Sequence, residues 1–177
     1  MIDLSLRADP AVLRPWRSTD RGALVRRADD RAIWRNMTDA FPHPYTLRDA
    51  VEWIARVEHQ IPPRHFAVLL DGELVGGAGV EPMPEFGGRS VNLGYWLGTD
   101  VWGRGIATAV VEALVPYAFG SLGAVRLQAT VFGWNPASAR VLEKNGFHRE
   151  GRLREAVCKD GDVTDLLVYG LLLEDRT

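Results

Sequence analysis

A strand, a turn with two glycines and a helix follow one another between Leu93 and Glu112, and no other stretch limits the fold as strongly. Gly103 and Gly105 allow positive φ in a tight turn and place no side chain on its inner side. The N-terminus of the helix that follows carries partial positive charge. The amides of residues 103–108 can then converge on one small space, so the sequence predicts a backbone site for a phosphate or diphosphate.

A tight strand-to-helix connection without a ligand is the alternative interpretation of the same glycines. Two common nucleotide motifs are excluded. The P-loop needs a Gly-Lys-Ser/Thr run, which the sequence lacks, and the dinucleotide fingerprint needs a glycine where Thr108 stands and an acid where Gln128 stands. The turn therefore has the form of an anion site, but these rules do not make it an ATP or NAD site.

Apolar periodicity and turn residues predict an α/β chain. Asp71-Gly72 and Asp160-Gly161 each separate two apolar or alternating runs, which is typical of hairpins. Ser18 and Thr19 are expected to cap one helix, and Thr46 to cap another. We expect a single domain over residues 1–177, built on a mixed, mostly antiparallel central sheet of about seven strands with helices on both faces. The expected strands are residues 12–16, 65–70, 74–80, 90–97, 125–131, 147–159 and 163–173, and the expected helices are 20–30, 46–57, 105–122 and 136–145, with 34–45 largely loop.

Composition narrows the class of protein. The 177 residues carry a net charge of −2, which gives no overall basic field for nucleic acid. The single cysteine, Cys158, excludes an intramolecular disulfide and a Cys-rich zinc site, and no metal is expected. No apolar run reaches membrane-spanning length, and residues 1–9 lack the apolar core of a signal peptide. We expect a cytoplasmic protein without a membrane partner.

A second motif, Asn-Pro-Ala-Ser, opens the helix after the strand at 125–131. Asn135 stands at the usual N-cap position and Ser138 in the first helical turn. Taken alone, this pattern is explained by helix capping and a solvated serine.

Together, the two motifs resemble the GNAT N-acetyltransferase superfamily, and its RimJ/RimL-like branch in particular. The resemblance rests on Trp-Gly-Arg-Gly-Ile-Ala-Thr before one helix, Asn-x-x-Ser before the next and Asn-Gly-Phe after it. It extends over nearly the whole chain, and includes Leu-Arg-Pro at 13–15 and Leu-Gly-Tyr-Trp-Leu at 93–97. Trp102 stands where the superfamily signature begins with Gln or Arg, as is familiar in this branch.

The resemblance implies the GNAT acyl-CoA N-acyltransferase fold with acetyl-CoA as cofactor and CoA as product. Backbone groups near Trp96 and Leu97 would pair with pantetheine, and one amide there would face the thioester oxygen. Asn135 would bond the pantetheine arm, and Ser138 would lie near the thiol. The diphosphate would be held by Gly103, Arg104, Gly105, Ile106, Ala107 and Thr108, with the Arg104 side chain either on phosphate or in solvent.

The implied reaction is attack of a primary amine on the thioester, and the amine must lose a proton. Many relatives place a glutamate base where Thr130 stands and a tyrosine acid where Leu142 stands, so neither role carries over. A glutamate that some RimJ/RimL-type relatives use corresponds to Val157. Ser138 does carry over as an acid or thiol partner, and Glu81, at the end of a strand, is the best candidate for the base.

The acceptor pocket is expected to include Glu81, Asn92, His43 and Tyr45. For each of these residues a solvated or purely structural role is the alternative, and a water chain is an alternative to a single base. The amine is a protein N-terminus or a small molecule, and the resemblance is compatible with a homodimer. Two other functions stay open: a non-catalytic acyl-CoA-binding module or sensor, and a nucleotide-binding protein without CoA specificity. The acyl chain length is also open.

Overall fold

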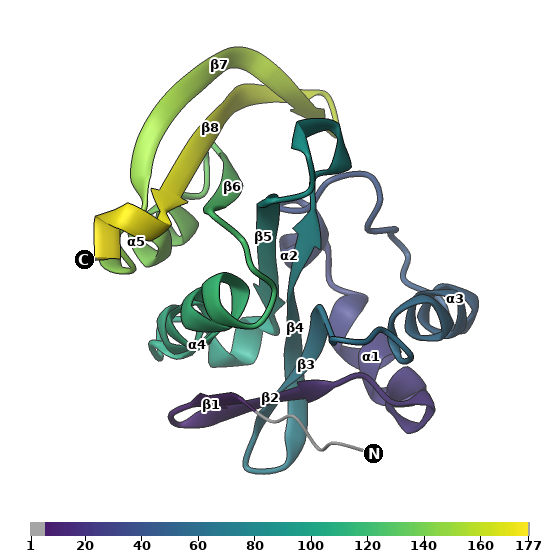
Figure 1. Ribbon diagram of the computed structural model, residues 1–177. Coiled ribbons are helices and arrows are strands. Elements are labelled where there is room, and N and C mark those ends of the chain that lie inside the picture. Colours follow the sequence, from purple (N-terminus) through teal and green to yellow (C-terminus); the bar gives the residue numbers. More distant parts are fainter. Residues whose placement is uncertain (1–5, 177) are drawn as a thin grey trace. The chain divides into compact units, whose positions relative to one another are not determined.

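The computed structural model describes residues 6–176, and eight strands in this part form one sheet (Figure 1). Along the sheet the hydrogen-bonded order is β1-β2-β3-β4-β5-β6-β8-β7. The strands are β1 (Leu6–Ala8), β2 (Ala11–Pro15), β3 (His65–Leu70), β4 (Glu73–Pro82), β5 (Ser90–Leu97), β6 (Arg126–Phe132), β7 (His148–Lys159) and β8 (Asp162–Leu172). The α-helices are α1 (Arg21–Ala28), α2 (Arg31–Trp34), α3 (Leu47–Val57), α4 (Ile106–Gly120) and α5 (Pro136–Lys144).

The sheet is mixed, as expected. β5 and β6 pair in parallel, with Ser90 opposite Arg126 and Asn92 opposite Gln128, and α4 connects them. Antiparallel pairs join β2 to β1 and β3, β3 to β4, and β8 to β6 and β7. Both predicted Asp-Gly hairpins are present, and each has positive φ at its two turn residues, which is the conformation that two-residue hairpins favour.

The chain divides into two compact units. Unit 1 comprises the described residues up to Val80 together with Gly94–Leu114, and unit 2 comprises Glu81–Leu93 and the described residues from Val115 onward. The glycine turn belongs to unit 1, and the Asn-x-x-Ser motif belongs to unit 2.

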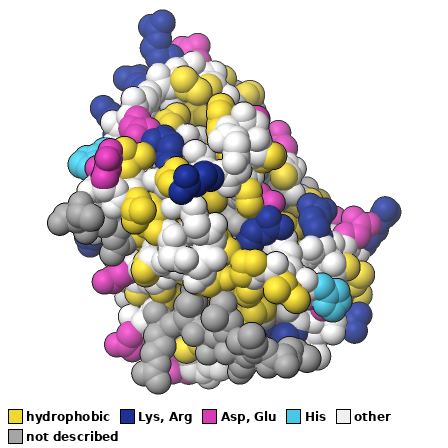
Figure 2. All heavy atoms as spheres, in the orientation of Figure 1, with side chains coloured by type: hydrophobic (Ala, Val, Ile, Leu, Met, Phe, Trp, Pro, Cys, Tyr) yellow, Lys and Arg dark blue, Asp and Glu magenta, His cyan; other side chains and the backbone are white. Residues whose placement is uncertain are grey.

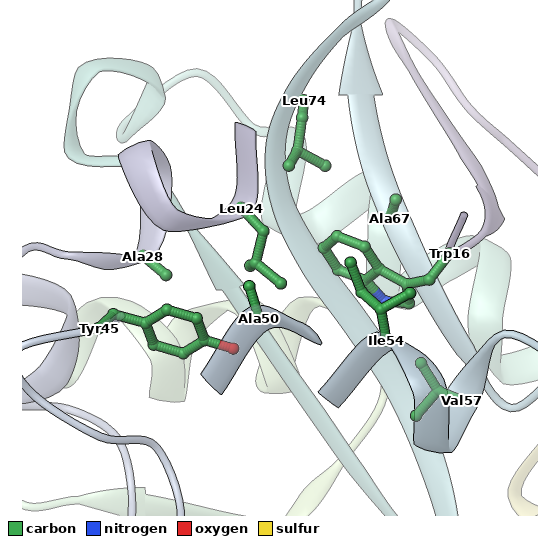
Figure 3. Packing of buried hydrophobic residues seen from close by; sticks show 9 residues of the cluster. All are labelled: Trp16, Leu24, Ala28, Tyr45, Ala50, Ile54, Val57, Ala67 and Leu74. Carbon is green, nitrogen blue, oxygen red and sulfur yellow. The ribbon is translucent and has the colours of Figure 1, made fainter. Parts of the chain in front are cut away.

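Apolar side chains from α1, α3 and the strands of unit 1 form one core cluster (Figure 3). Thr46 caps α3, as predicted, and its side chain accepts a hydrogen bond from the amide of Asp49. Capping fixes the start of α3, so Ala50, Ile54 and Val57 are the residues of this helix that enter the cluster. The cluster contains Trp16, Leu24, Ala28, Tyr45, Ala50, Ile54, Val57, Ala67 and Leu74.

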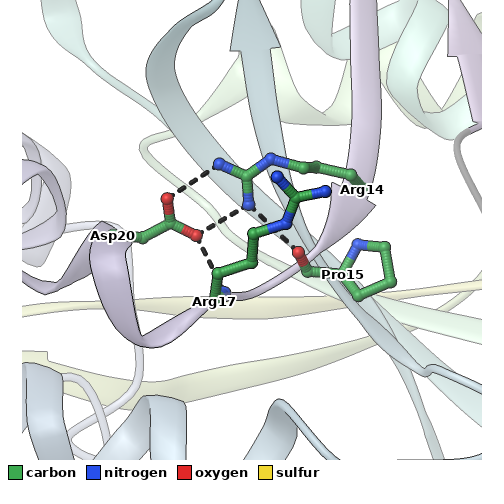
Figure 4. A network of polar contacts seen from close by, with 4 residues as sticks. All are labelled: Arg14, Pro15, Arg17 and Asp20. Atoms are coloured by element: carbon green, nitrogen blue, oxygen red, sulfur yellow. Dashed lines mark hydrogen bonds and ion pairs between the residues drawn. The ribbon is translucent and has the colours of Figure 1, made fainter. Parts of the chain in front are cut away.

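An ion pair fixes the turn between β2 and α1 (Figure 4). Both terminal nitrogens of Arg14 donate to the carboxylate of Asp20 at 2.7 Å, and the backbone amide of Arg17 donates to the same carboxylate at 2.9 Å. Asp20 is buried, so removal of either charge would leave the other in a poorly solvated place. This pair corrects one prediction: Ser18 and Thr19 do not cap α1, because the turn is closed by Asp20 instead.

Unit 2 is built on β6, β8 and β7, with α5 held to β8 by a hydrogen bond from the buried Tyr169 hydroxyl to Glu143 at 3.0 Å. The register of β7 against β8 shifts between Leu153 and Val157. Within this bulge Glu155 has a φ of +54°, and its amide donates to the Asp165 carboxylate at 2.9 Å. Most residues of β7 are exposed, so its sequence shows no simple alternation of apolar and polar residues.

Charged side chains of both signs are interspersed with apolar ones over the face drawn in Figure 2. Among residues 6–176, none of the helices has the length and apolar character needed to cross a membrane.

Candidate active site

The glycine turn begins where β5 ends. The amide of Gly98 donates to the carbonyl of Val75 at 2.7 Å, which joins the end of β5 to β4. A short 3-10 turn over Thr99–Val101 follows, and the indole Nε1 of Trp102 donates back to the carbonyl of Leu97 at 2.8 Å. This bond gives Trp102 a structural role at the position where the superfamily signature begins with another residue.

Both glycines of the turn have positive φ, as the sequence predicts, and open space lies where a side chain would project from either one. Gly103 has a φ of +74° and Gly105 one of +79°, and a Cβ added at either glycine would meet no heavy atom within 4 Å. α4 starts at Ile106, and its first helical hydrogen bond here runs from the Ala109 amide to the Gly105 carbonyl at 3.1 Å. The amides of a first helical turn have no acceptor within their own helix. A glycine turn with positive φ and open space at a helix N-terminus fits a bound diphosphate.

Two polar contacts brace this turn from the N-terminal helices. Arg27 of α1 donates through Nε to the carbonyl of Leu74 at 2.9 Å and through a terminal nitrogen to Asp100 at 2.7 Å. Asp30, which caps α2, accepts from the hydroxyl of Thr99 at 3.0 Å. A Cβ at Gly98 would lie 2.8 Å from the Asp100 carboxylate, so a side chain there would displace the carboxylate from its present position.

The backbone at the end of β5 is pressed closely against β4. A Cβ added at Gly76 would lie 2.2 Å from the Trp96 carbonyl, and one at Gly77 would lie 2.8 Å from the Trp96 indole nitrogen and 2.9 Å from the Trp16 ring. Two successive glycines therefore set the position of Trp96 and Leu97, the residues expected to meet pantetheine.

The Asn-x-x-Ser motif forms the N-terminus of α5 in unit 2. Asn135 is the N-cap, and its side-chain oxygen accepts from the Ser138 amide at 3.1 Å. Ser138 is half-buried in the first turn. Asn135 therefore caps α5, as in the alternative interpretation of this motif. The cap uses the oxygen of the Asn135 side chain.

The expected acceptor residues differ in their surroundings. Glu81 is exposed near the end of β4, and Asn92 is exposed on β5 opposite Gln128. Of the two positions where many relatives carry acid–base groups, Thr130 is exposed on β6 and Leu142 is fully buried.

The loop carrying His43 and Tyr45 is tied to the end of α1. The Asp29 carboxylate accepts from the Tyr45 amide at 2.9 Å and lies 3.4 Å from His43 Nδ1. The His43 ring stacks on Trp34 at 5.5 Å. The Tyr45 ring lies in the core cluster beside Ala28, and burial raises the pKa of its hydroxyl to about 12, with Asp49 adding to the shift. The hydroxyl therefore stays neutral at physiological pH.

The sequence did not reveal the brace at Arg27 and Asp100, whose positions are 73 residues apart. No rule of sequence spacing relates two residues so far apart. Arg27 is also one of several arginines in its segment, so the sequence does not single it out. The only available signal was the presence of Asp100 three residues before the first glycine of the turn.

A parallel strand pair joined by a helix, with an open glycine turn where that helix begins, defines an α/β protein that can bind a diphosphate-containing cofactor. The family model described as "Acetyltransferase (GNAT) domain" matches residues 11–148. The chain belongs to this family. It is therefore an N-acetyltransferase that uses acetyl-CoA as its acyl donor, and the open glycine turn fits the diphosphate of that donor.

Individual proteins agree with this assignment. The chain is 27% identical to the uncharacterized N-acetyltransferase p20 of Bacillus licheniformis, over 95% of this chain and 96% of that protein. It is 33% identical to the putative ribosomal N-acetyltransferase YdaF of Bacillus subtilis (strain 168), over 59% of this chain and 57% of that protein. Among solved structures, Mycobacterium smegmatis RimJ in complex with CoA-disulfide superposes with a TM-score of 0.80 and 27% identity, over 98% of this chain and 88% of that one. These relatives support the RimJ/RimL-like branch.

Proposed function

We propose that this enzyme transfers an acetyl group from acetyl-CoA to a primary amine, which attacks the thioester directly. The observation that carries the proposal is the glycine turn, whose two residues of positive φ leave open space at the N-terminus of α4. The family model spans parts of both compact units, which supports one acetyltransferase domain rather than two.

The chain would bind the cofactor mainly through its backbone. Amides of residues 103–108 would hold the diphosphate, and the exposed Arg104 would add a positive charge. Backbone groups of Trp96 and Leu97, fixed by the close approach of β4, would pair with pantetheine and face the thioester oxygen. Since the Asn135 oxygen caps α5, the Nδ2 group is the part that would donate to the pantetheine arm.

The bound donor supplies an activated acyl group. The residues of the site must then remove a proton from the amine and stabilise the departing thiolate. A free α-amino group has a pKa of about 8, so a base that takes its proton increases the reactive fraction. Glu81 is our candidate for that base, because its exposed carboxylate at the end of β4 is accessible to an incoming amine. Ser138 is our candidate for the acid or hydrogen-bond partner of the departing thiolate.

Protein N-terminal amines are the first acceptor class to test, because relatives include a putative ribosomal N-acetyltransferase and RimJ. Small amines are the second class. Asn92, His43 and Tyr45 are proposed to lie around the acceptor, with Tyr45 acting through the position of its loop because its ring is buried.

The test is release of CoA from acetyl-CoA in the presence of peptides with free N-termini and of small amines. We expect at least one amine to raise release well above hydrolysis. Ser138→Ala should lower kcat about tenfold or more while the CoA Kd stays within about twofold. Glu81→Gln should lower kcat about tenfold or more and make the acidic limb of the kcat/KM profile against pH less steep, because the ionisation of the base is removed and only that of the amine remains. Failure of every amine would refute the acetyltransferase proposal, and unchanged kcat or an unchanged pH profile would remove the role of the residue concerned.

A second candidate is an acyl-CoA-binding module without turnover. It is favoured by Leu142, which is fully buried where many relatives place a tyrosine acid, and by Thr130 at the usual position of the base. Tight CoA binding by calorimetry without acetylation of any amine would support it.

A further inference from the structure

The turn that we assign to the diphosphate contains an acidic side chain. Asp100 lies three residues before Gly103, and three residues span at most about 11 Å. Its side chain is 57% exposed. The hydrogen bond from Arg27 and, to a lesser degree, the charge of Arg104 hold the pKa of Asp100 below its usual range, so Asp100 is ionised at neutral pH. Asp100 is therefore a negatively charged neighbour of the turn to which we assign the diphosphate.

Arg27 is placed to cancel that charge. One of its terminal nitrogens donates to Asp100 at 2.7 Å, while its Nε donates to the carbonyl of Leu74 at 2.9 Å. The second bond anchors the guanidinium to β4, so its position does not depend on Asp100 alone. Arg104 also lies within electrostatic range of Asp100. Without Arg27, Asp100 would both repel the diphosphate and compete for Arg104.

We propose that Arg27 is a positioning residue for the cofactor: by pairing with Asp100 it neutralises the diphosphate turn and leaves Arg104 for the phosphate. The inference rests on the proposed function, because it assumes that the diphosphate of CoA binds at this turn. Arg27 touches neither cofactor nor substrate in this role and acts through Asp100. The pair is partly exposed, so its effect on folding stability is small and its effect on the cofactor is electrostatic.

The test is the Kd of CoA, measured by calorimetry, in a double-mutant cycle. Arg27→Ala should weaken CoA binding about fivefold at low salt, and less at 0.5 M NaCl. Asp100→Asn should not weaken binding. The double variant should return to within about twofold of the parent, and Arg27→Lys should recover most of the loss. Arg48→Ala, which breaks the exposed pair with Glu52 on α3, is the matched control and should have no effect.

A second substrate separates positioning from general damage to the fold. S-acetylpantetheine carries the thioester without the diphosphate, so Arg27→Ala should change its kcat/KM by less than about twofold. Equal losses with both donors, or a loss that Asp100→Asn does not restore, would show that Arg27 supports the structure only. An unchanged CoA Kd in Arg27→Ala would also overturn the inference. Failure of the parent protein to bind CoA would instead refute the proposed function, and that measurement comes first.

Discussion

Gly105 and Gly161 have nearly the same backbone conformation but different expected roles. Their φ angles are +79° and +82°, and a Cβ added at either position would meet no heavy atom within 4 Å. Substitution by alanine should cost each protein about 1 kcal/mol of unfolding free energy, because both residues would be forced into the left-handed region. Only Gly105→Ala should weaken CoA binding, by about tenfold or more, since its methyl group enters the diphosphate space. Calorimetry on both variants checks this, and equal CoA affinities would contradict the site.

Single residues were predictable where the governing interaction is local. The caps at Thr46 and Asn135 follow from side chains that reach an amide three residues ahead, and both are present. The expected caps Ser18 and Thr19 were wrong, because a buried ion pair of Asp20 with Arg14 determines that turn. The indole of Trp102 and the brace at Arg27 depend on the folded arrangement, so no sequence rule indicated them.

β4 approaches β5 closely, and this provides a prediction for the element. Gly76→Ala should lower the unfolding free energy by about 3 kcal/mol, because its Cβ would lie 2.2 Å from the Trp96 carbonyl and the strand must move. Gly94→Ala on β5 is the control, since nothing lies within 4 Å of its added Cβ, and it should be neutral or slightly stabilising. Urea unfolding of both variants measures the difference. If Gly76→Ala is as stable as Gly94→Ala, the close approach does not position Trp96.

Helices and strands were predictable where the spacing of apolar residues and the turn residues at the ends of a run indicate the same element. β3, β5 and the two Asp-Gly hairpins match the sequence expectation closely, because apolar runs end at strong turn signals. β1 and α2 were not expected, since they have three and four residues and offer no periodic pattern. On α3, Val51 is 43% exposed, whereas Trp53 is partly buried and packs against the core cluster.

For the whole molecule, the sheet and the backbone conformation of the glycine turn could be predicted from the sequence, whereas the surroundings of the amine acceptor could not. Backbone sites depend on glycines and helix ends, which the sequence displays directly. The acceptor side depends on exposed residues such as Glu81 and Asn92, whose roles are set by what approaches them.

The stability of the whole fold should fall in mild acid because of one histidine. His65 begins β3, its Nδ1 lies 3.0 Å from Gln60 Oε1, and burial, aided by Arg64 and Arg56, lowers its pKa to about 4. The unfolded chain, with a histidine pKa of about 6.5, binds the extra proton first, so stability is complete above about pH 6.5 and declines as the pH falls toward 4. The expected loss is about 2–3 kcal/mol. The carboxylates with lowered pKa values, Asp49, Asp100, Glu150 and Asp165, lose their contributions only at lower pH.

His65→Gln should flatten the profile of unfolding free energy against pH between pH 6.5 and 4. His59→Gln, at a side chain that is 86% exposed, should leave this profile unchanged. Urea unfolding across this range decides the matter, because a parent profile without a slope there would mean that His65 is protonated in the folded protein.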